Sequence, residues 1–401
     1  MLARVFRAFQ YRDFRLLWFG ACTSSIGSWM QKLAQAWLVL QISNSPFLLG
    51  LDAFLGELPI VLFALVGGVV ADRRDRRGLL LASQVVQMSS ALLLALLAGL
   101  GVVRVWHILC LSFVAGLGQA FGAPAYQALL PSLVKVEDLS NAIAMNSIQF
   151  NLARVIGPVL GGLALTGFGA SLCFALNGAS FLAVIVALLS LHVVFVPSHT
   201  GQSVMDSMKQ GLRFVRRHPV LPSLVGLAFA TTMLGVPLIV FLPVFAKNVF
   251  GRGAGAYTLL LAVYGAGAIA GALVVAALGN THAKGRSALM FLAGLGLATC
   301  AFATCRLLPA SCVFLFLAGA CLVGVLSLVS SLVQQLVGDA MRGRVMSVYG
   351  VAFRGGMPVG SLLGGLLVPH IGAPIALAIN GALLFALGIY LFLVQRRVAA
   401  L

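Results

Sequence analysis

Three ionisable residues in the first two long apolar stretches have types and spacing that suit proton chemistry: Lys32, Asp52 and Glu57. Lys32 lies twelve residues before Asn44, where we place the turn between the two stretches, and Glu57 lies thirteen residues after it. At about 1.5 Å per residue of helix, both lie about 18 to 20 Å from this turn, so an ion pair is geometrically possible. Asp52 is five residues from Glu57 and therefore points to another side of the same helix.

A carboxyl group at this depth suits reversible proton binding. Burial favours the neutral form of the carboxyl group and a neighbouring cation favours its ionised form, so the two effects together can bring its pKa toward physiological pH. A proton on Glu57 would then release the amine of Lys32 and change the charge that a nearby molecule meets. A static pair that joins two helices is the alternative, and the sequence leaves both open. We expect Glu57 to carry proton coupling, with the shallower Asp52 as the second candidate.

Two further cations, Arg154 and Arg354, lie inside later apolar stretches, each four residues before a proline. They could line a substrate cavity, or they could bond to backbone carbonyls that the prolines leave free, and we favour the second role for Arg354. Gln31 and Asn151 complete the set of polar residues that we expect along the cavity.

Membrane-spanning helices must position these residues. The chain of 401 residues is 61% apolar and only 9% charged, with a mean hydropathy of +1.07, whereas a soluble domain carries about 25% charged residues. Its apolar runs of about 20 residues match the length of a helix that crosses the hydrocarbon core. We predict an all-α polytopic membrane protein with twelve spans, at residues 16–41, 47–71, 79–100, 106–130, 141–167, 172–195, 221–246, 256–279, 287–305, 310–334, 345–368 and 374–394.

The net charge of +17 is explained by where the basic residues lie. With the N-terminus inside, nineteen of the 26 Lys and Arg residues fall on the cytoplasmic side and four fall outside. The positive-inside rule then places both termini in the cytoplasm, and we expect the protein in a bacterial inner (plasma) membrane. The basic excess indicates contact with anionic lipids, and no nucleic-acid partner is expected.

The chain contains an internal duplication. The Arg-x-x-x-Pro pattern at Arg154 recurs 200 residues later at Arg354, and a pair of adjacent glycines recurs at an offset of 203. These repeats predict two six-helix halves, residues 1–196 and 220–401, joined by a cytoplasmic linker at 197–219.

The linker itself has the pattern of an amphipathic helix. Between residues 204 and 217 its bases fall on one helical face, with Leu212, Phe214 and Val215 between them. We expect this segment to lie along the inner leaflet as a surface helix.

A dense charge cluster follows the second span, in the tract Gly68-Val-Val-Ala-Asp72-Arg73-Arg74-Asp75-Arg76-Arg77. Each charge at the bilayer centre costs about 2.5 to 3.5 kcal/mol, so this tract is a surface loop. The duplication brings Asp72 to the same rim as Arg342 and Arg344, and a contact of about 1 to 3 kcal/mol there could bias a two-state gate. Simple anchoring of the turn to lipid headgroups is the alternative. The expected gate residues are Gly68, Asp72, Arg73, Arg76, Arg77, Arg342 and Arg344.

Small residues form a motif in the fifth span, at Gly157, Pro158, Gly161 and Gly162. Such residues allow close contact between helices, and the proline permits a bend. Ordinary helix packing and a dedicated role in exchange transport both fit this motif.

Taken together, these motifs resemble a known family. The tract from Gly68 to Arg77 resembles the signature that major facilitator superfamily transporters carry between their second and third spans, with Asp75 where the usual pattern has glycine. The fifth-span run is similar to the antiporter motif of the drug-exporting branches, and residues 27–40 and 212–217 look like bacterial multidrug and siderophore exporters. The resemblance implies proton-coupled export of amphipathic small molecules by alternating access. It also implies a monomer whose partners are a small-molecule substrate, protons and membrane lipids.

The sequence contains no motif that indicates an enzyme. It has no phosphate-binding Gly-x-x-x-x-Gly-Lys loop and no His, Cys or Asp cluster with ligand spacing, so we expect no catalytic residue, metal or cofactor. Two other readings stay open. One is an uncoupled or uptake facilitator of a metabolite or lipid, and the other is a non-transporting receptor or scaffold on the same fold.

Overall fold

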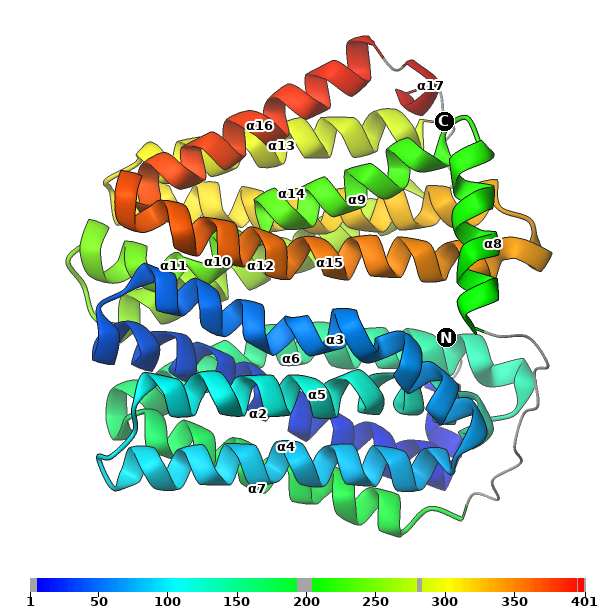
Figure 1. The fold of residues 1–401 in the computed structure, drawn as a ribbon, viewed down its shortest axis with the longest axis horizontal. Helices are drawn as coiled ribbons and strands as arrows, with labels where there is room; N and C mark the ends of the chain where they lie inside the picture. Colours follow the sequence, from blue (N-terminus) through cyan, green and yellow to red (C-terminus); the bar gives the residue numbers. More distant parts are fainter. Residues whose placement is uncertain (1–5, 193–203, 280–282, 395, 400–401) are drawn as a thin grey trace. The chain divides into compact units, whose positions relative to one another are not determined.

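The computed structural model describes residues 6–192, 204–279, 283–394 and 396–399, and these residues form helices joined by short turns, without a strand among them (Figure 1). Eleven of the described helices are long and apolar enough to cross a membrane. The first long helix, α2 (Arg12–Ser43), has 32 residues but is less apolar because it includes Gln31, Lys32 and Gln35. The helices fall where the sequence predicts the twelve spans, which confirms the all-α membrane fold.

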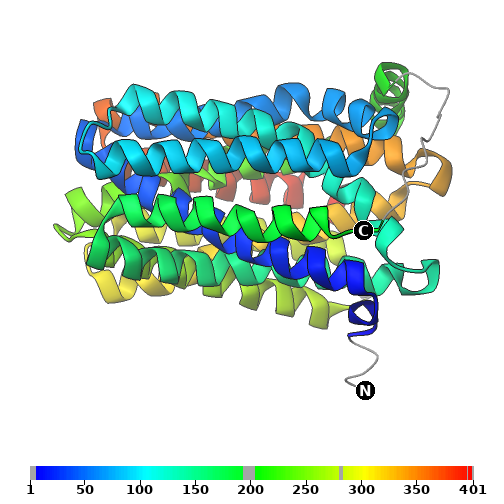
Figure 2. The same ribbon diagram turned by 90° about the horizontal axis from the view of Figure 1, so that it is seen from below.

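The chain divides into two compact units, of which the first comprises residues 1–43 and 55–201. Its helix α2 packs against α6 and α7, and α4 packs against α5 and α7. The neighbouring helices α4 and α5 run side by side in both views (Figures 1 and 2). The elements of this unit, besides α2, are η1 (Arg7–Gln10), most of α3 (Pro46–Arg73), α4 (Arg76–Gly99), α5 (Val105–Leu129), η2 (Leu130–Leu133), η3 (Val136–Asp138), α6 (Leu139–Phe168) and α7 (Ala170–Leu189).

The second unit comprises residues 202–401 together with residues 44–54, the beginning of α3. Its helix pairs repeat those of the first unit, since α9 packs on α15, and α13 packs on both α14 and α16. The elements are α8 (Val204–Arg217), α9 (Leu221–Gly235), α10 (Pro237–Val240), α11 (Leu242–Val244), η4 (Phe245–Val249), α12 (Ala254–Leu278), α13 (Lys284–Thr304), α14 (Leu308–Leu336), α15 (Asp339–Ile371), α16 (Ala373–Leu393) and α17 (Arg396–Ala399).

Two predicted spans differ from the structure in their detail. The seventh, expected as one helix over 221–246, is broken after Gly235 into α9, α10, α11 and η4. Pro237 and Pro243 lie at the starts of α10 and α11, where a missing amide hydrogen interrupts the helical ladder. The sixth span ends at Leu189, earlier than expected, and residues 193–195 lie outside the described part of the chain.

The predicted linker helix is present as α8, which lies crosswise to α9 and α15 of its own unit (Figure 1). Its docking depends on Gly211, because a Cβ atom there would lie only 2.6 Å from the carbonyl oxygen of Arg344. Val215 is buried, whereas Leu212 is exposed, so only part of the apolar face packs within this unit.

Candidate functional site

The expected pair between α2 and α3 forms within the first unit. Lys32 Nζ lies 3.6 Å from Glu57 Oε1. The side chain of Lys32 is 64% exposed and that of Glu57 is 24% exposed. An exposed ammonium group in the middle of a spanning helix needs water beside it, since contact with hydrocarbon would cost several kcal/mol, about 2.5 to 3.5 on insertion scales. We therefore expect this pair to face water.

An indole ring joins this pair to a second cation. Lys32 Nζ lies 5.4 Å from the ring centroid of Trp29, and the guanidinium carbon of Arg154 lies 5.7 Å from the same centroid. Both distances fall within the range of cation–π attraction. The Nε atom of Arg154 is buried and has no hydrogen-bond partner among the described residues. We call Trp29, Lys32, Glu57 and Arg154 the Trp29 cluster.

Trp29 is a member that the sequence analysis does not single out as a site residue. Its spacing carries the signal, because residues three apart on a helix share a face and Trp29 lies three positions before Lys32. The indole supplies an aromatic surface beside two cations and one carboxylate. This combination can bind a molecule that has both an apolar ring and a charge.

The glycine motif of α6 positions the cluster. Gly157 lies directly against the Cβ atom of Trp29, and a Cβ atom at Gly161 would lie 2.9 Å from the Cα atom of Met30. Pro158 and Gly162 are also buried. Because these small residues let α6 approach α2, the side chain of Arg154 reaches the Trp29 ring.

The second unit repeats this arrangement. Gly360 of α15 packs against the backbone of Met233 in α9, as Gly161 packs against Met30. Arg354 lies in α15 of the second unit and is partly exposed. The glycines thus pack helices inside each unit, and a further role in exchange stays a prediction.

Gln31 belongs to a separate polar chain across three helices. The side chain of Asn177 in α7 donates to Gln31 Oε1 at 2.6 Å, and Gln31 Nε2 donates to Gln35 Oε1 at 3.3 Å. Gln35 Nε2 then donates to Ser112 Oγ in α5 at 2.8 Å. This chain satisfies polar groups between helices and so fixes the rotation of α2, which carries Trp29 and Lys32.

Asn151 and Asp52 are the two other residues that the sequence predicts along the cavity. Asn151 donates from Nδ2 to the Ser147 carbonyl at 2.8 Å, a bond within its own helix. Asp52 is only 7% exposed and lies in the part of α3 that belongs to the second unit. Of the two acids in α3, Glu57 is therefore the one that the structure brings together with Lys32.

The charged tract after α3 begins the next helix through Asp75. Its carboxylate accepts hydrogen bonds from the backbone amides of Arg77 and Gly78, both at 3.0 Å, and so caps α4. Asp is among the most favourable N-cap residues because it satisfies amide groups that have no partner inside the helix. This explains how an aspartate is accommodated where the usual signature has glycine.

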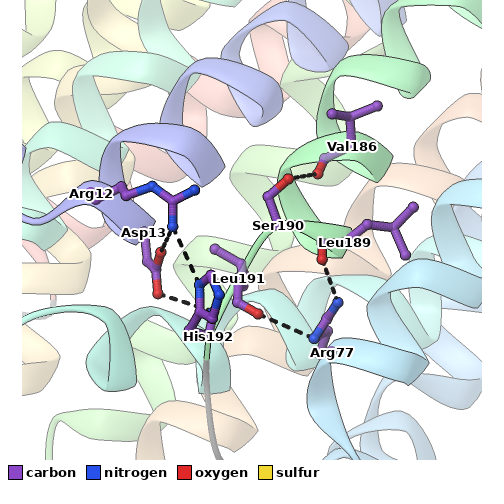
Figure 3. A network of polar contacts seen from close by, with 8 residues as sticks. All are labelled: Arg12, Asp13, Arg77, Val186, Leu189, Ser190, Leu191 and His192. Atoms are coloured by element: carbon purple, nitrogen blue, oxygen red, sulfur yellow. Dashed lines mark hydrogen bonds and ion pairs between the residues drawn. The ribbon is translucent and has the colours of Figure 1, made fainter.

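Arg76 and Arg77 bind the carbonyl ends of neighbouring helices. Arg76 Nη1 donates to the Ala128 carbonyl near the end of α5 at 3.1 Å. Arg77 donates to the carbonyls of Leu189 and Leu191 at 2.8 and 3.2 Å, at the end of α7 (Figure 3). Cations at helix C-termini satisfy free carbonyls and complement the helix dipole. Both arginines therefore hold helix ends together within the first unit.

The same end of α7 is bound to the start of α2. The His192 amide donates to Asp13 Oδ2 at 3.2 Å, and Arg12 Nη1 lies 3.3 Å from His192 Nδ1 and 3.8 Å from Asp13 Oδ1 (Figure 3). The starts of α2 and α4 and the end of α7 thus form one polar junction.

The remaining gate residues lie at the end of α3 and the start of α15. The side chain of Asp72 lies outside the described residues, Arg73 is exposed, and a Cβ atom at Gly68 would meet no described atom within 4 Å. Arg342 pairs with Asp339 one turn earlier in α15 at 2.6 Å. Arg344 Nη1 lies 3.5 Å from the sulfur atom of Met341.

Asp138, a buried acid just before the predicted fifth span, is not among the residues that the sequence predicts for the site. It is 4% exposed and accepts hydrogen bonds from Gln10 Nε2 and the Tyr11 hydroxyl, both at 2.8 Å. These bonds dock the segment before α2 onto the start of α6. An aspartate directly before a helix suggests a cap, yet this one makes no side-chain cap bond, so its actual partners are distant in the sequence.

No group of three or more His, Cys, Asp or Glu residues in the described parts of the chain could hold a metal ion. The seven cysteines are free thiols. The carboxylate of Glu57 can bind a proton, and the ring of Trp29 with its neighbouring cations can bind a guest molecule noncovalently.

Known proteins resemble this chain along its whole length. Residues 3–400 match the model of a family described as transmembrane secretion effector. Macrolide efflux protein A of Streptococcus pyogenes is 22% identical over 388 residues, which cover 94% of each chain. The enterobactin exporter EntS of Shigella boydii serotype 4 is 29% identical over 336 residues, which cover 82% of this chain and 79% of that protein.

Solved structures show the same fold. A bacterial homologue of the human lysosomal transporter Spinster, in an inward-facing and unoccupied conformation, has a TM-score of 0.71 at 16% identity and covers 97% of this chain and 95% of its own. This likeness concerns the fold alone. The family match confirms the resemblance that the Gly68–Arg77 tract and the fifth-span motif indicate. The chain belongs to the transmembrane secretion effector family of the major facilitator superfamily, a family of multi-pass membrane transporters.

Proposed function

We propose that this protein exports amphipathic small molecules, drugs or siderophore-like compounds, across the bacterial inner membrane in exchange for protons. The observation that carries the proposal is the Trp29 cluster, in which a carboxylate at mid-membrane pairs with an exposed amine at 3.6 Å. An ionisable group inside a span is costly and is a functional-site candidate for that reason. The efflux proteins among the relatives support the direction of transport.

The cluster couples proton and substrate through charge. With Glu57 ionised, the cluster contains two cations and one carboxylate, and the carboxylate pairs with Lys32. A proton on Glu57 removes the carboxylate charge, frees Lys32 and leaves two uncompensated cations beside the Trp29 ring. Any substrate whose affinity depends on that charge must, in turn, change the proton affinity of Glu57 by the same factor.

The sign of this linkage decides between exchange and co-transport. A substrate with an amine needs the ionised carboxylate of Glu57 and competes with the proton, which gives exchange. A substrate with an anionic group binds better when Glu57 is protonated, which gives movement in the same direction. The proposed export by proton exchange therefore requires competition at Glu57, with the Trp29 ring holding the apolar part of the substrate.

Release of protons on substrate binding tests the proposal directly. The purified protein in weakly buffered detergent solution is mixed with candidate amines, neutral compounds and anions, and the pH change is recorded. Proton release that disappears in Glu57→Gln supports exchange. Proton uptake indicates co-transport instead. Transport by proteoliposomes without any proton change would support an uncoupled facilitator, and binding without transport would support a receptor.

We further propose that the protein works by alternating access, with a fixed orientation in the membrane. Residues 1–196 and 220–401 act as two rocking halves of a monomer, joined by the linker at 197–219. Both termini lie in the cytoplasm, as the positive-inside rule requires. Asp72 and Arg344 close the inner side, and loss of their contact opens it.

A further inference from the structure

A cavity lies beside the linker helix, where α8 and the start of α9 meet Met341 of α15, within the second unit. Its volume is about 520 Å³. Gln210, Arg213, Arg217 and His218 supply its polar wall. Phe214, Pro219 and Met341 supply an apolar wall. The side chains that line the cavity therefore include three basic groups, and none of them is a carboxylate.

The two guanidinium groups are placed to act together. Arg213 and Arg217 are four residues apart in α8, so they lie on one helix face in successive turns. Neither has a hydrogen-bond or ion-pair partner among the described residues, and both side chains are exposed. A guanidinium fork presents parallel N–H groups that match the oxygens of a phosphate. Gln210, one turn earlier, adds an amide donor.

His218 is held in one tautomer by the start of α9. Its Nδ1 atom accepts hydrogen bonds from the backbone amides of Val220 and Leu221, at 3.2 and 3.3 Å. With Nδ1 as the acceptor, Nε2 carries the hydrogen and is the remaining donor of the ring. The ring stacks on Phe214 with 6.3 Å between centroids, which further fixes its orientation.

The walls of the cavity belong to helices that pack against each other. Gly211 brings the α8 backbone against the Arg344 carbonyl, with 2.6 Å to a Cβ atom placed there. Val215 is buried on the same side of α8. The basic wall of α8 and Met341 of α15 are therefore parts of one docked assembly rather than of a loose surface helix.

We propose that this cavity binds a phosphate group through Arg213, Arg217 and His218. Two guanidinium forks and an imidazole N–H match a phosphate mono- or diester, and the apolar wall accommodates carbon atoms attached to it. The headgroup of an anionic phospholipid and a free phosphate share this chemistry. The apolar wall favours the phospholipid over free phosphate as the ligand.

The test compares two double variants of the full-length protein that lose the same charge. Arg213→Gln with Arg217→Gln removes the guanidinium groups from the cavity. Lys209→Gln with Arg216→Gln removes two exposed bases of α8 that do not line it. Binding of phosphatidylglycerol is measured by native mass spectrometry and by titration into phosphatidylcholine nanodiscs. We expect the first variant to lose at least about tenfold in affinity and the second less than about threefold.

Two further measurements control for misfolding of the double variants and distinguish a phospholipid from free phosphate as the ligand. Arg217→Lys keeps the charge but loses the fork, and we expect an intermediate loss. Inorganic phosphate, titrated as a second probe, should compete with the lipid in the parent protein. Phosphate binding without lipid binding would support a soluble phosphate ligand. Equal losses in the two double variants would overturn the proposal, because attraction to the membrane surface would then explain the binding. A parent protein that binds neither probe would overturn it as well.

Discussion

Gly157 of α6 lies directly against Trp29 of α2, and Arg154, one turn earlier in α6, reaches the face of the same indole ring at 5.7 Å. The glycine motif and the charged cluster, which are separate patterns in the sequence, are therefore one structural unit. Close approach of the two helix backbones is the condition for Arg154 to reach the ring that Lys32 also approaches. A change in helix packing at Gly157 should alter the site even though glycine has no chemistry of its own.

Gly157→Ala should therefore lower both stability and transport. The added methyl group meets the Cβ of Trp29 and the backbone of α2, and such overpacking typically costs about 1 to 3 kcal/mol. Gly167→Ala is the matched control in the same helix, because a Cβ atom there meets nothing within 4 Å. It should raise stability slightly, by up to about 1 kcal/mol. Apparent melting temperatures in detergent and transport rates check both variants, and equal behaviour of the two would contradict the packing role.

Asp75 should be replaceable by glycine but not by alanine. Loss of an N-cap to alanine costs about 0.5 to 2 kcal/mol, whereas glycine costs only a few tenths. Asp75→Ala should therefore lower the apparent melting temperature more than Asp75→Gly, and Asp75→Asn should stay close to the parent protein. If alanine and glycine lower it equally, the cap seen at the start of α4 does not contribute to stability.

The sequence predicts the helices well because their length and apolarity are imposed by the membrane. It misses the break of the seventh span because the hydrophobic pattern continues through Pro237 and Pro243 and hides the loss of backbone bonds. The depth of Lys32 and Glu57 follows from counting residues, and their equal depth makes an ion pair possible. The position of Arg154 over Trp29 does not follow, because it depends on how closely α6 approaches α2.

Contacts between residues that are distant in the sequence are the second feature that the sequence does not predict. The charged tract predicts Arg76 and Arg77 as gate residues, but it does not indicate that both bind carbonyl groups at helix ends. No motif in the sequence singles out Asp138, yet it is buried and accepts hydrogen bonds from Gln10 and Tyr11. Such contacts depend on where the ends of non-adjacent helices meet, and hydrophobic periodicity carries no information about that.

The inner gate should depend on Asp72 and Arg344 more than on Arg342. Arg342 already pairs with Asp339 in its own helix, so its loss should change little. Asp72→Asn and, less strongly, Arg344→Ala should raise cysteine labelling near the inner rim. A contact of about 1 to 3 kcal/mol would change a balanced equilibrium by a factor of about 5 to 150. Unchanged labelling with full transport in both variants would reduce the tract to a lipid anchor.

Membrane topology can be read with reporters that are active only in the cytoplasm. A reporter inserted after Arg217 or fused at Leu401 should be active, because the nineteen basic residues lie on that side. A reporter at Asn44 or Gly251 should be silent, since both follow an odd number of spans. The reverse pattern would exclude the proposed orientation of the twelve spans.

Glu57→Gln should separate proton coupling from substrate binding. The amide keeps hydrogen-bonding capacity beside Lys32 but cannot titrate, so transport driven by a pH gradient should be lost while substrate counterflow persists. Asp52→Asn is the matched control, because Asp52 lies in the same helix but is 7% exposed and belongs to the second unit. It should reduce driven transport less. Both rates are measured in proteoliposomes with the same substrate, under an imposed pH gradient and in its absence.

The pattern across these two variants identifies the coupling acid. Loss of driven transport in Glu57→Gln with retained counterflow places the proton on the carboxylate that faces Lys32 at 3.6 Å. Loss only in Asp52→Asn assigns the proton to the buried acid of the second unit, and the ion pair of Lys32 is then a static link between α2 and α3. Full activity in both variants means that no carboxylate of α3 carries the proton. Transport would then run without coupling at this site, and the Trp29 cluster would serve substrate binding alone.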